Sequence, residues 1–394
     1  MRQYHLISLI ILLGLLGACK PEAFISNPIE VKDLATEIEY IEHNLKTEGQ
    51  DEGSYYLLDR MEHHKVPGVS ITVVEAGQIK WSRAYGVSDS KTNAPIDTNT
   101  LFQAASISKP ISALLALRLA EEGKVDLDEN VNTYLEGWQV PDNEFTLTEK
   151  VSLRRLMSHS AGTSVHGFAG YKSSASIPTL EMVLAGEGNS SAVEVQETPG
   201  REWRYSGGGY SIMEKVIEDV SGKPLEEYFD ELIAQSLEMT NSRFDQPLPD
   251  QFHDQASSGH NRRGKPISGN WRNHPEQAAA GLWTTSRDLA KYCIEIHEIY
   301  NGKQDGILSP ASVQLMLTEE SDQWGLGPHL GSGSQNNVVF QHGGVNTGFV
   351  NQFVGFADTG NAVVIMTNGD NGASLYLEIL RGMEDFYGWD LVAE

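Results

Sequence analysis

Ser106 and Lys109 form the first pair of residues in this sequence whose types and spacing could do chemistry. They lie three positions apart in the stretch QAASISKP. This spacing places both side chains on one face of a helix, close enough for an amine to reach a hydroxyl. The pair could transfer an acyl group if the lysine were neutral, which requires lowering its pKa by about 3 units, or about 4 kcal/mol. The alternative is a helix-capping serine beside a solvated lysine.

The same spacing occurs again at Ser88 and Lys91, and the surroundings separate the two pairs. Ser88 lies in a polar stretch that predicts a surface turn. Ser106 precedes an apolar helix predicted over residues 111–124, and Pro110 is tolerated because it falls in the first turn. The unpaired N–H groups of a helix N-terminus would then lie beside Ser106. We therefore take Ser106 and Lys109 as the candidate pair for chemistry.

Two further motifs supply residues that such a pair would need. Tyr205 precedes a glycine-rich turn in WRYSGGGY, and His342 ends a predicted strand in QHGGVNTGF. A tyrosine could carry a proton between the pair and a leaving group, while glycines beside His342 would let the backbone approach closely. Taken singly, Tyr205 also fits the wall of a cleft, and His342 also fits a turn.

The strands that would position these residues come from both ends of the chain. Residues 69–75 and 78–85 are rich in β-formers and flank an Ala-Gly pair, which is a hairpin signal. Three more strands are predicted near the C-terminus, with the sequences NVVFQHGG, FVNQFVGFA and NAVVIMTN. The pattern predicts one antiparallel sheet assembled from distant parts of the chain.

Helices are predicted both around this sheet and between its two halves. The stretch GASLYLEILRGMEDFY has helical periodicity at the C-terminus, and residues of about 111–275 are mainly helical runs and polar loops. One of these helices is predicted from Ser152 to Gly162. The predicted fold class is α+β: an antiparallel sheet built from both chain ends and flanked by helices, with an inserted, mainly helical subdomain.

The N-terminus has the features of a secreted and lipid-anchored protein. Residues 1–18 are predicted to be a signal peptide, since their apolar run is shorter than the ~20 residues that span a bilayer. The following LGAC resembles a bacterial lipobox, so Cys19 is the expected lipidation site, and an ordinary signal peptide is the alternative. Residues 19–29 would form a tether and residues 30–394 one domain. Lys20 after the cysteine favours the outer membrane by analogy with Gram-negative lipoproteins, which places the protein in the bacterial cell envelope.

Composition narrows the classes of partner. The 394 residues carry a net charge of −25, which argues against nucleic acid and against electrostatic binding to anionic lipid. Membrane contact is therefore expected through the lipid anchor alone. Neither an HExxH motif nor a cluster of cysteine and histidine occurs, so no metal is implied. Apart from Cys19 the sequence has a single cysteine, Cys293, and no intramolecular disulfide is expected.

In this order, the three motifs around Ser106, Tyr205 and His342 resemble the serine β-lactamase-like family. That family includes class C β-lactamases, penicillin-binding D-alanyl-D-alanine peptidases, D-aminopeptidases and related esterases. The resemblance extends over roughly 53–390 and includes segments such as VPGVSITVVEAGQIKWSRAYG, LRRLMSHSAGT and VVIMTNGD. It implies a β-lactamase-like fold and a serine hydrolase that needs no cofactor.

The resemblance also implies a role for individual residues. Ser106 would be the nucleophile that forms an acyl-enzyme, and Lys109 and Tyr205 would pass its proton to the leaving group and later activate water. The backbone N–H groups of Ser106 and Val345 would form the oxyanion hole. Substrate contacts would come from the strand end, at His342, Gly343, Gly344 and Asn346.

Two departures from the family pattern bear on the substrate. Many relatives have Tyr-x-Asn where this chain has Tyr205-Ser206-Gly207, and His342 replaces the lysine of the KTG motif. A neutral imidazole attracts a β-lactam carboxylate less than an ammonium does, although protonation at lower pH would restore part of that attraction. Both changes favour an esterase or a D-amino-acid peptidase acting on a small-molecule or peptide substrate. The first alternative is a β-lactamase or D-alanyl-D-alanine carboxypeptidase, and the second is a non-catalytic envelope binding protein.

Overall fold

The computed structural model describes residues 33–49, 53–332 and 337–392. The predicted signal peptide, the predicted lipidation site at Cys19 and the predicted tether all lie outside the described residues. Within those residues, every helix is too short or too polar to cross a membrane.

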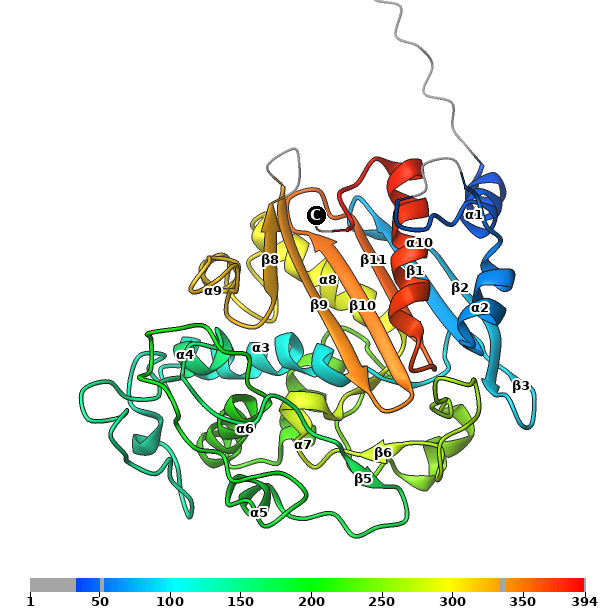
Figure 1. Cartoon of the computed structure of the whole chain (residues 1–394). Helices are drawn as coiled ribbons and strands as arrows, with labels where there is room; N and C mark the ends of the chain where they lie inside the picture. Colours follow the sequence, from blue (N-terminus) through cyan, green and yellow to red (C-terminus); the bar gives the residue numbers. More distant parts are fainter. Residues whose placement is uncertain (1–32, 50–52, 333–336, 393–394) are drawn as a thin grey trace, which may run out of the picture.

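A seven-stranded antiparallel sheet forms the centre of the described chain (Figure 1). Its strand order is β3-β2-β1-β11-β10-β9-β8. The strands are β1 (Gly68–Glu75), β2 (Gln78–Asp89), β3 (Ala94–Pro95), β8 (His329–Ser332), β9 (Val338–Asn346), β10 (Phe349–Phe356) and β11 (Ala362–Thr367). Because β1 pairs with β11, with Val69 opposite Thr367, the two ends of the chain build one sheet, as the sequence predicted.

The alternation of side chains along β1 explains how the sheet is covered on both faces. Ile71 and Val73 pack into the apolar cluster that contains the first two helices and the last one. Ser70 and Thr72 point to the opposite face, where each hydroxyl lies 2.8 Å from the Ser286 hydroxyl of α8 (Ser286–Tyr300). A strand with two buried faces needs this period of two.

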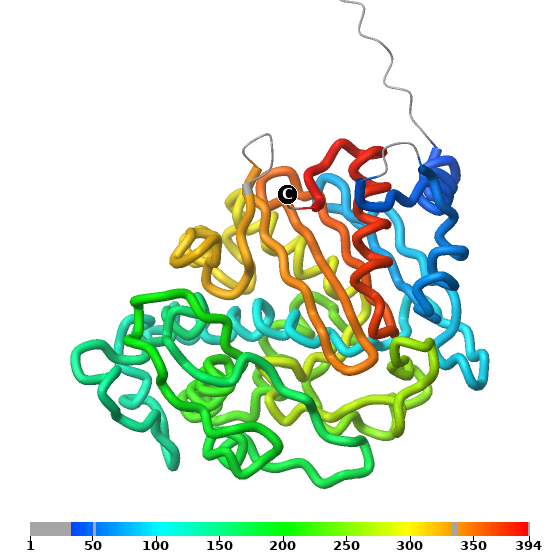
Figure 2. The backbone as a smooth tube through the Cα atoms, viewed as in Figure 1, coloured from blue at the N-terminus to red at the C-terminus, as the bar shows by residue number. Residues whose placement is uncertain are grey.

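The helices from the two chain termini lie together on one face of the sheet. α1 (Leu34–His43) and α2 (Leu57–His64) contact α10 (Gly372–Tyr387), which packs on β10. Figure 2 shows these blue and red segments side by side, far apart as they are in the sequence. α8 covers the other face and contacts β1 and β11.

Between β4 (Phe102–Gln103) and β7 (Trp283–Thr284), which pair with each other, the regular elements are almost all helices, joined by long loops. The α-helices of this stretch are α3 (Ser108–Glu121), α4 (Leu153–Met157), α5 (Leu180–Leu184), α6 (Gly207–Ser221) and α7 (Leu225–Phe229). It also contains two short strands that pair with each other, β5 (Tyr171–Lys172) and β6 (Arg272–Asn273). Short helical turns are η1 (Ala105–Ile107), η2 (Val131–Thr133), η3 (Asp230–Ala234), η4 (Asp250–Gln255) and η5 (Gln277–Gly281), and α9 (Pro310–Met316) follows α8. This arrangement agrees with the predicted mainly helical insertion.

Two helix boundaries differ from the sequence prediction. α4 starts after Ser152, whose side chain caps it, but ends at Met157 rather than at Gly162. His159 has a φ of 58°, a left-handed conformation that cannot continue a helix. α3 begins at Ser108, before the predicted position 111, and is buried from Ser108 to Leu117 because η5, α4, α6 and α7 pack around it.

Candidate active site

Ser106 and Lys109 meet at the start of the buried helix α3. Ser106 belongs to η1 and is partly exposed, whereas its neighbours on both sides are buried. The Lys109 Nζ atom donates to Ser106 Oγ at 3.2 Å and to the Ala279 carbonyl at 2.8 Å. Lys109 itself is only 2% exposed, so a solvated lysine is excluded. The structure brings Ser106 and Lys109 into contact, as their spacing predicted. Ser88 lies in strand β2 rather than in the predicted surface turn, and only Lys91 lies in the exposed turn after that strand.

The charge state of Lys109 follows from its surroundings. Burial lowers the pKa of Lys109 to about 7, because the ammonium has lost its water and its two hydrogen-bond partners are a hydroxyl and a carbonyl. A large part of the population is thus neutral near pH 7. A neutral amine 3.2 Å from the Ser106 hydroxyl can accept its proton.

A close approach of β9 to η1 brings the strand motif to the serine. A side chain at Gly344 would place its Cβ 2.0 Å from the Ala104 carbonyl, so only glycine fits there. Ala105, just before Ser106, has a φ of 54°, a conformation that costs a non-glycine residue energy and marks functional turns. β8 pairs with β9 only as far as Gln341, and the stretch beyond it is open beside η1.

Tyr205 joins the pair from the residue before the cap of α6. Lys109 Nζ lies 4.9 Å from the centre of the Tyr205 ring. Burial raises the pKa of Tyr205 above its usual value, and the hydrogen bond with the Ser106 hydroxyl lowers it only in part. The phenol therefore keeps its proton at neutral pH. Ser106, Lys109 and Tyr205 thus form one connected group, drawn from elements about 100 residues apart.

His159 holds Tyr205 in place, a role that sequence reasoning missed. The His159 carbonyl accepts from Arg204 N at 2.7 Å, and its Nδ1 accepts from Ser206 N at 3.1 Å. Its ring lies on the Tyr205 ring with centroids 4.2 Å apart. Burial lowers the pKa of His159 well below its usual value, helped by the positive charge of Lys109. No local signal in the sequence links His159 to a tyrosine 46 residues later.

His342 lies near Tyr205 but carries no charge. Its Nδ1 donates to the Gly343 carbonyl at 2.5 Å, and the ring centroids of His342 and Tyr205 are 6.3 Å apart. Burial lowers the pKa of His342 to about 3, and the charge of Lys109 contributes. The sequence analysis left room for protonation at lower pH. The structure places that protonation far below physiological pH, so His342 is a neutral polar contact.

The remaining strand-end residues have different environments. Asn346 is buried, and its Nδ2 donates to Gln103 Oε1 at 3.3 Å and to the Ala280 carbonyl at 3.2 Å. Its amide N–H groups thus tie β9 to η5. The Val345 side chain is 70% exposed, so this position of the strand faces solvent at the mouth of the site. A Cβ at Gly343 would lie 2.9 Å from Gln352 Oε1.

Aromatic rings form the other side of the site. Trp324 lies with its ring centroid 5.7 Å from that of Tyr205, 5.6 Å from that of His342 and 5.6 Å from that of Trp203. The Trp324 carbonyl accepts from the backbone N–H of Glu320 at 2.8 Å. The turn that carries Trp324 is thus fixed through Glu320.

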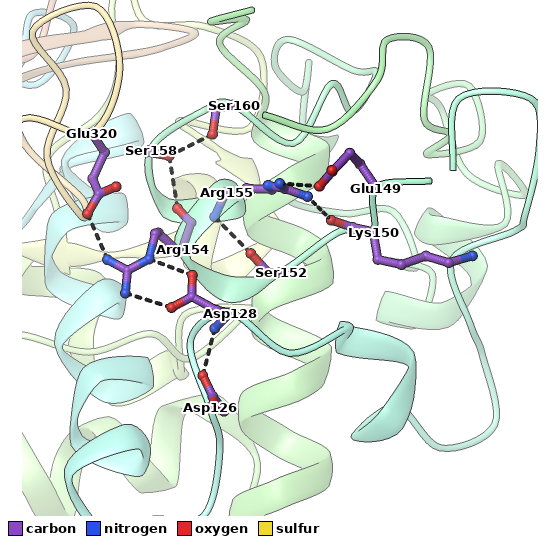
Figure 3. Close-up of polar contacts among 10 residues, drawn as sticks. All are labelled: Asp126, Asp128, Glu149, Lys150, Ser152, Arg154, Arg155, Ser158, Ser160 and Glu320. Carbon is purple, nitrogen blue, oxygen red and sulfur yellow. Dashed lines mark hydrogen bonds and ion pairs between the residues drawn. The ribbon is translucent and has the colours of Figure 1, made fainter. Parts of the chain in front are cut away.

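Arg154 anchors that turn to the helical part of the protein. Figure 3 shows its guanidinium between Asp128, at 2.7 and 2.9 Å, and Glu320, at 2.7 Å. These carboxylates raise the pKa of Arg154 above its usual value. Because His159 follows Arg154 in one short segment, α4 and the turn after it support both Tyr205 and the Trp324 turn.

The site holds a polar, mostly uncharged set of groups. Lys109 is the one cation among the residues named above around Ser106, beside hydroxyl, amide, imidazole and indole side chains. In the described ranges, no group of three or more histidine, cysteine, aspartate or glutamate residues could hold a metal ion. The arrangement can accept a proton from a serine, return it through a phenol, and admit a substrate carbonyl at the open edge of β9.

Comparisons with known proteins agree with this geometry. The family profile described as Beta-lactamase matches residues 56–383. Among curated proteins, Esterase EstB of Burkholderia gladioli is 28% identical over 203 residues, which cover 49% of this chain and 50% of that protein. Teichoic acid D-alanine hydrolase of Staphylococcus aureus (strain MRSA252) is 26% identical over 249 residues, which cover 62% and 58%. The chain thus spans only about half the length of these relatives.

Solved structures share the fold at lower sequence identity. The octameric penicillin-binding protein homologue from Pyrococcus abyssi superposes with a TM-score of 0.69 at 22% identity, covering 84% of this chain and 76% of that one. EstCE1, described as a hydrolase with promiscuous acyltransferase activity, gives a TM-score of 0.68 at 22% identity, with coverage of 82% and 95%. These similarities confirm the β-lactamase-like fold that the sequence predicted.

Proposed function

This chain belongs to the Beta-lactamase family, and we propose that it is a serine hydrolase that cleaves an ester or amide through an acyl-enzyme on Ser106. The observation that carries the proposal is the buried Lys109, with a pKa of about 7 and its Nζ 3.2 Å from Ser106 Oγ. Relatives named as an esterase and as a D-alanine hydrolase support this class of reaction.

Acylation would begin with attack of Ser106 Oγ on the substrate carbonyl carbon. The serine proton passes to neutral Lys109, and the N–H groups of Ser106 and Val345 hold the oxyanion. When the tetrahedral intermediate collapses, the bond to the leaving group breaks. The leaving group takes the Tyr205 proton, and Tyr205 regains a proton from Lys109.

Deacylation would use the same groups in reverse. A water molecule gives its proton to the Lys109–Tyr205 pair as its oxygen attacks the acyl carbon. The ester bond to Ser106 breaks, and the serine oxygen recovers the proton as the acid product leaves. Lys109 must be neutral at the start of both acylation and deacylation.

The charge of the site supports an ester or amide substrate over a β-lactam. His342 is neutral because burial lowers its pKa to about 3, so the strand offers no fixed cation to a substrate carboxylate. At the position of the family's asparagine stands Gly207, the first residue of α6, which has no side chain to contact an acyl group. Both observations favour a neutral or cationic substrate.

The test is hydrolysis of a short-chain p-nitrophenyl ester by the full-length chain and by its Ser106→Ala variant, with a chromogenic cephalosporin in parallel. Ser88→Ala is the matched control, because it changes the other serine that precedes a lysine by three residues. We expect ester turnover that Ser106→Ala abolishes and Ser88→Ala retains, with slow or no cephalosporin turnover. Equal ester turnover in the wild type and Ser106→Ala would refute Ser106 as the nucleophile.

We also propose that Cys19 carries a lipid that holds the protein in the bacterial envelope. The support is the LGAC sequence behind an apolar run of signal-peptide length. Mass spectrometry of the membrane fraction should show a lipidated N-terminal cysteine, and Cys19→Ala should release the protein from membranes. An unmodified Cys19 in the membrane-bound protein would contradict the proposal.

A further inference from the structure

Trp324 lies at the centre of a cluster of rings on one side of the site. Its ring centroid is 5.0 to 5.7 Å from the ring centroids of His159, Trp203, Tyr205, His329 and His342. Trp324 is only 8% exposed. The indole is a large and rigid side chain, so it fills the space between these rings.

This cluster lies where the leaving group of a substrate must come. Tyr205 shares a hydrogen bond with the Ser106 hydroxyl, and in the proposed reaction it gives its proton to the leaving group. That group must therefore come within about 3 Å of the Tyr205 hydroxyl. The Trp324 ring meets the Tyr205 ring at 75° and the His342 ring at 87°. A leaving group that approaches Tyr205 therefore meets the indole.

Hydrogen bonds and packing hold the indole in this place. The Trp324 backbone N–H donates to the Ser321 carbonyl at 2.8 Å, and the indole Nε1 donates to the Gly327 carbonyl at 3.2 Å. Gly327 lies against α3, the helix that carries Lys109, because a Cβ at this glycine would be 2.9 Å from the Ala113 Cβ. The Trp324 turn is therefore fixed against the same helix that positions the lysine.

The backbone just before the indole is strained. Asp322 and Gln323 have φ values of 48° and 61°, in the left-handed region that is unfavourable for residues other than glycine. The Gln323 carbonyl accepts from Leu330 N at 2.6 Å, which ties this pair to β8. Strain of this kind persists where the surrounding structure enforces it, and it clusters at functional sites. It supports a role for the turn in presenting Trp324 to the site.

Buried ring nitrogens around the indole lack hydrogen-bond partners among the described residues. They are His159 Nε2, His342 Nε2 and Trp203 Nε1. His159 Nδ1 accepts from Ser206 N, so the neutral ring carries its hydrogen on Nε2 and offers a donor there. His342 Nδ1 donates to the Gly343 carbonyl, so its Nε2 offers an acceptor. Buried polar atoms are nearly always paired, and these are unpaired because the indole excludes the water or polar group that would otherwise reach them.

We propose that Trp324 restricts the substrate to a small leaving group, because its indole fills the space beside Tyr205 that a larger group would need. The inference rests on the proposed function, since only acyl transfer to Ser106 has a leaving group. A small group can reach Tyr205 without moving the indole. A larger one must displace a ring that hydrogen bonds and the packing of its turn on α3 hold in place. A smaller side chain at position 324 would open this space.

Two esters that differ in the size of the leaving group test the proposal. Phenyl acetate and 2-naphthyl acetate share one acyl group, and their leaving groups have similar acidity. We expect the full-length wild-type chain to prefer phenyl acetate in kcat/KM by at least about tenfold, which corresponds to about 1.4 kcal/mol. In Trp324→Ala that preference should fall to about twofold or less. A wild type without a preference for phenyl acetate, or a preference that Trp324→Ala leaves unchanged, would overturn the inference.

Two further variants separate the space beside Tyr205 from damage to the fold. Trp324→Phe keeps a smaller aromatic ring, so it disturbs the packing less than Trp324→Ala and should lower the preference for phenyl acetate about threefold. Trp389→Ala removes a tryptophan that stacks on Tyr387 and packs against the apolar cluster of the terminal helices, and it should keep the wild-type preference. An unchanged preference in Trp324→Phe, or an equal loss in Trp389→Ala, would refute a specific role for Trp324.

A binding measurement covers the case in which the wild type hydrolyses neither ester. Phenyl acetate and 2-naphthyl acetate are titrated into the Ser106→Ala chain, with and without Trp324→Ala, and followed by NMR chemical shifts. An affinity for the naphthyl ester that rises relative to the phenyl ester when the indole is removed would support the space-filling role of Trp324 even if the proposed hydrolysis failed. The same ratio of affinities in both proteins would sink the inference, whatever the kinetics showed.

Discussion

Replacing Lys109 with methionine should make the protein more stable at pH 7 while abolishing acylation of Ser106. The Lys109 side chain is buried, and its Nζ contacts a serine hydroxyl and the Ala279 carbonyl rather than a carboxylate. Methionine fills a similar volume and carries no charge to bury. A buried lysine that is retained for catalysis is expected to lower the stability of the fold, so replacing it should raise that stability.

The size of the effect follows from the shift in pKa. Burial lowers the pKa of Lys109 from 10.5 to about 7. The difference of about 3.5 pKa units corresponds to about 5 kcal/mol, at about 1.4 kcal/mol per unit. Methionine leaves the Ala279 carbonyl without a donor, which costs about 1 to 3 kcal/mol. The free energy of unfolding at pH 7 should therefore rise by about 2 to 4 kcal/mol.

The sign of the pH dependence is fixed by the same shift. Below pH 7, lysine is protonated in both the folded and the unfolded chain, and the folded chain bears the full penalty of the buried charge. Between pH 7 and 10.5 the unfolded chain binds the extra proton, so wild-type stability from this group rises with pH. The advantage of Lys109→Met should thus be largest at pH 7 and below, and should shrink or reverse by pH 10.

Urea unfolding at pH 7 and pH 10 measures this advantage, with p-nitrophenol release in the first turnover as the assay of acylation. Lys215→Met is the control, because Lys215 pairs with Asp219 and Glu181 and its pKa is raised. That variant should lose stability at both pH values. A Lys109→Met protein that is less stable than the wild type at pH 7, or whose gain is the same at both pH values, would refute the reasoning.

Three further predictions concern the same site. The acylation rate of Ser106 should rise with pH to a plateau with a midpoint near 7, and a stopped-flow profile that is flat from pH 5 to 9 would contradict a lysine base. His159→Phe should lower kcat by about 10- to 100-fold, because loss of the acceptor for Ser206 N displaces Tyr205. His159→Asn keeps an acceptor and should lower kcat less. Equal kcat values for the two variants in a steady-state assay would disprove that His159 positions Tyr205. Arg154→Ala should lower the free energy of unfolding in urea by only about 1 kcal/mol, because its ion-pair partners are partly exposed. It should also raise KM, because the Trp324 turn loses its anchor. An unchanged KM would argue against a link between Arg154 and the site.

Short sequence patterns were enough to predict the first hairpin turn and the C-terminal helix. The hairpin at Ala76 and Gly77 was predicted from two β-rich runs, and both residues adopt the positive φ values that such a turn needs. The C-terminal helix was predicted with the bounds that α10 has, because its apolar residues repeat with helical period and Gly388 ends it. The predicted end of α4 was wrong because His159 is held in a left-handed conformation by hydrogen bonds with Arg204 and Ser206, which lie far along the chain.

The sequence by itself determined which residues could form the site, and tertiary structure decided what state they are in. Ser106 and Lys109 share one helical turn, so their spacing alone brings them together. The charge of Lys109 depends on burial against Ala279, 170 residues away, and that of His342 on burial beside Lys109. Periodicity and turn residues act over a few positions, whereas pKa values depend on neighbours that only the folded chain assembles.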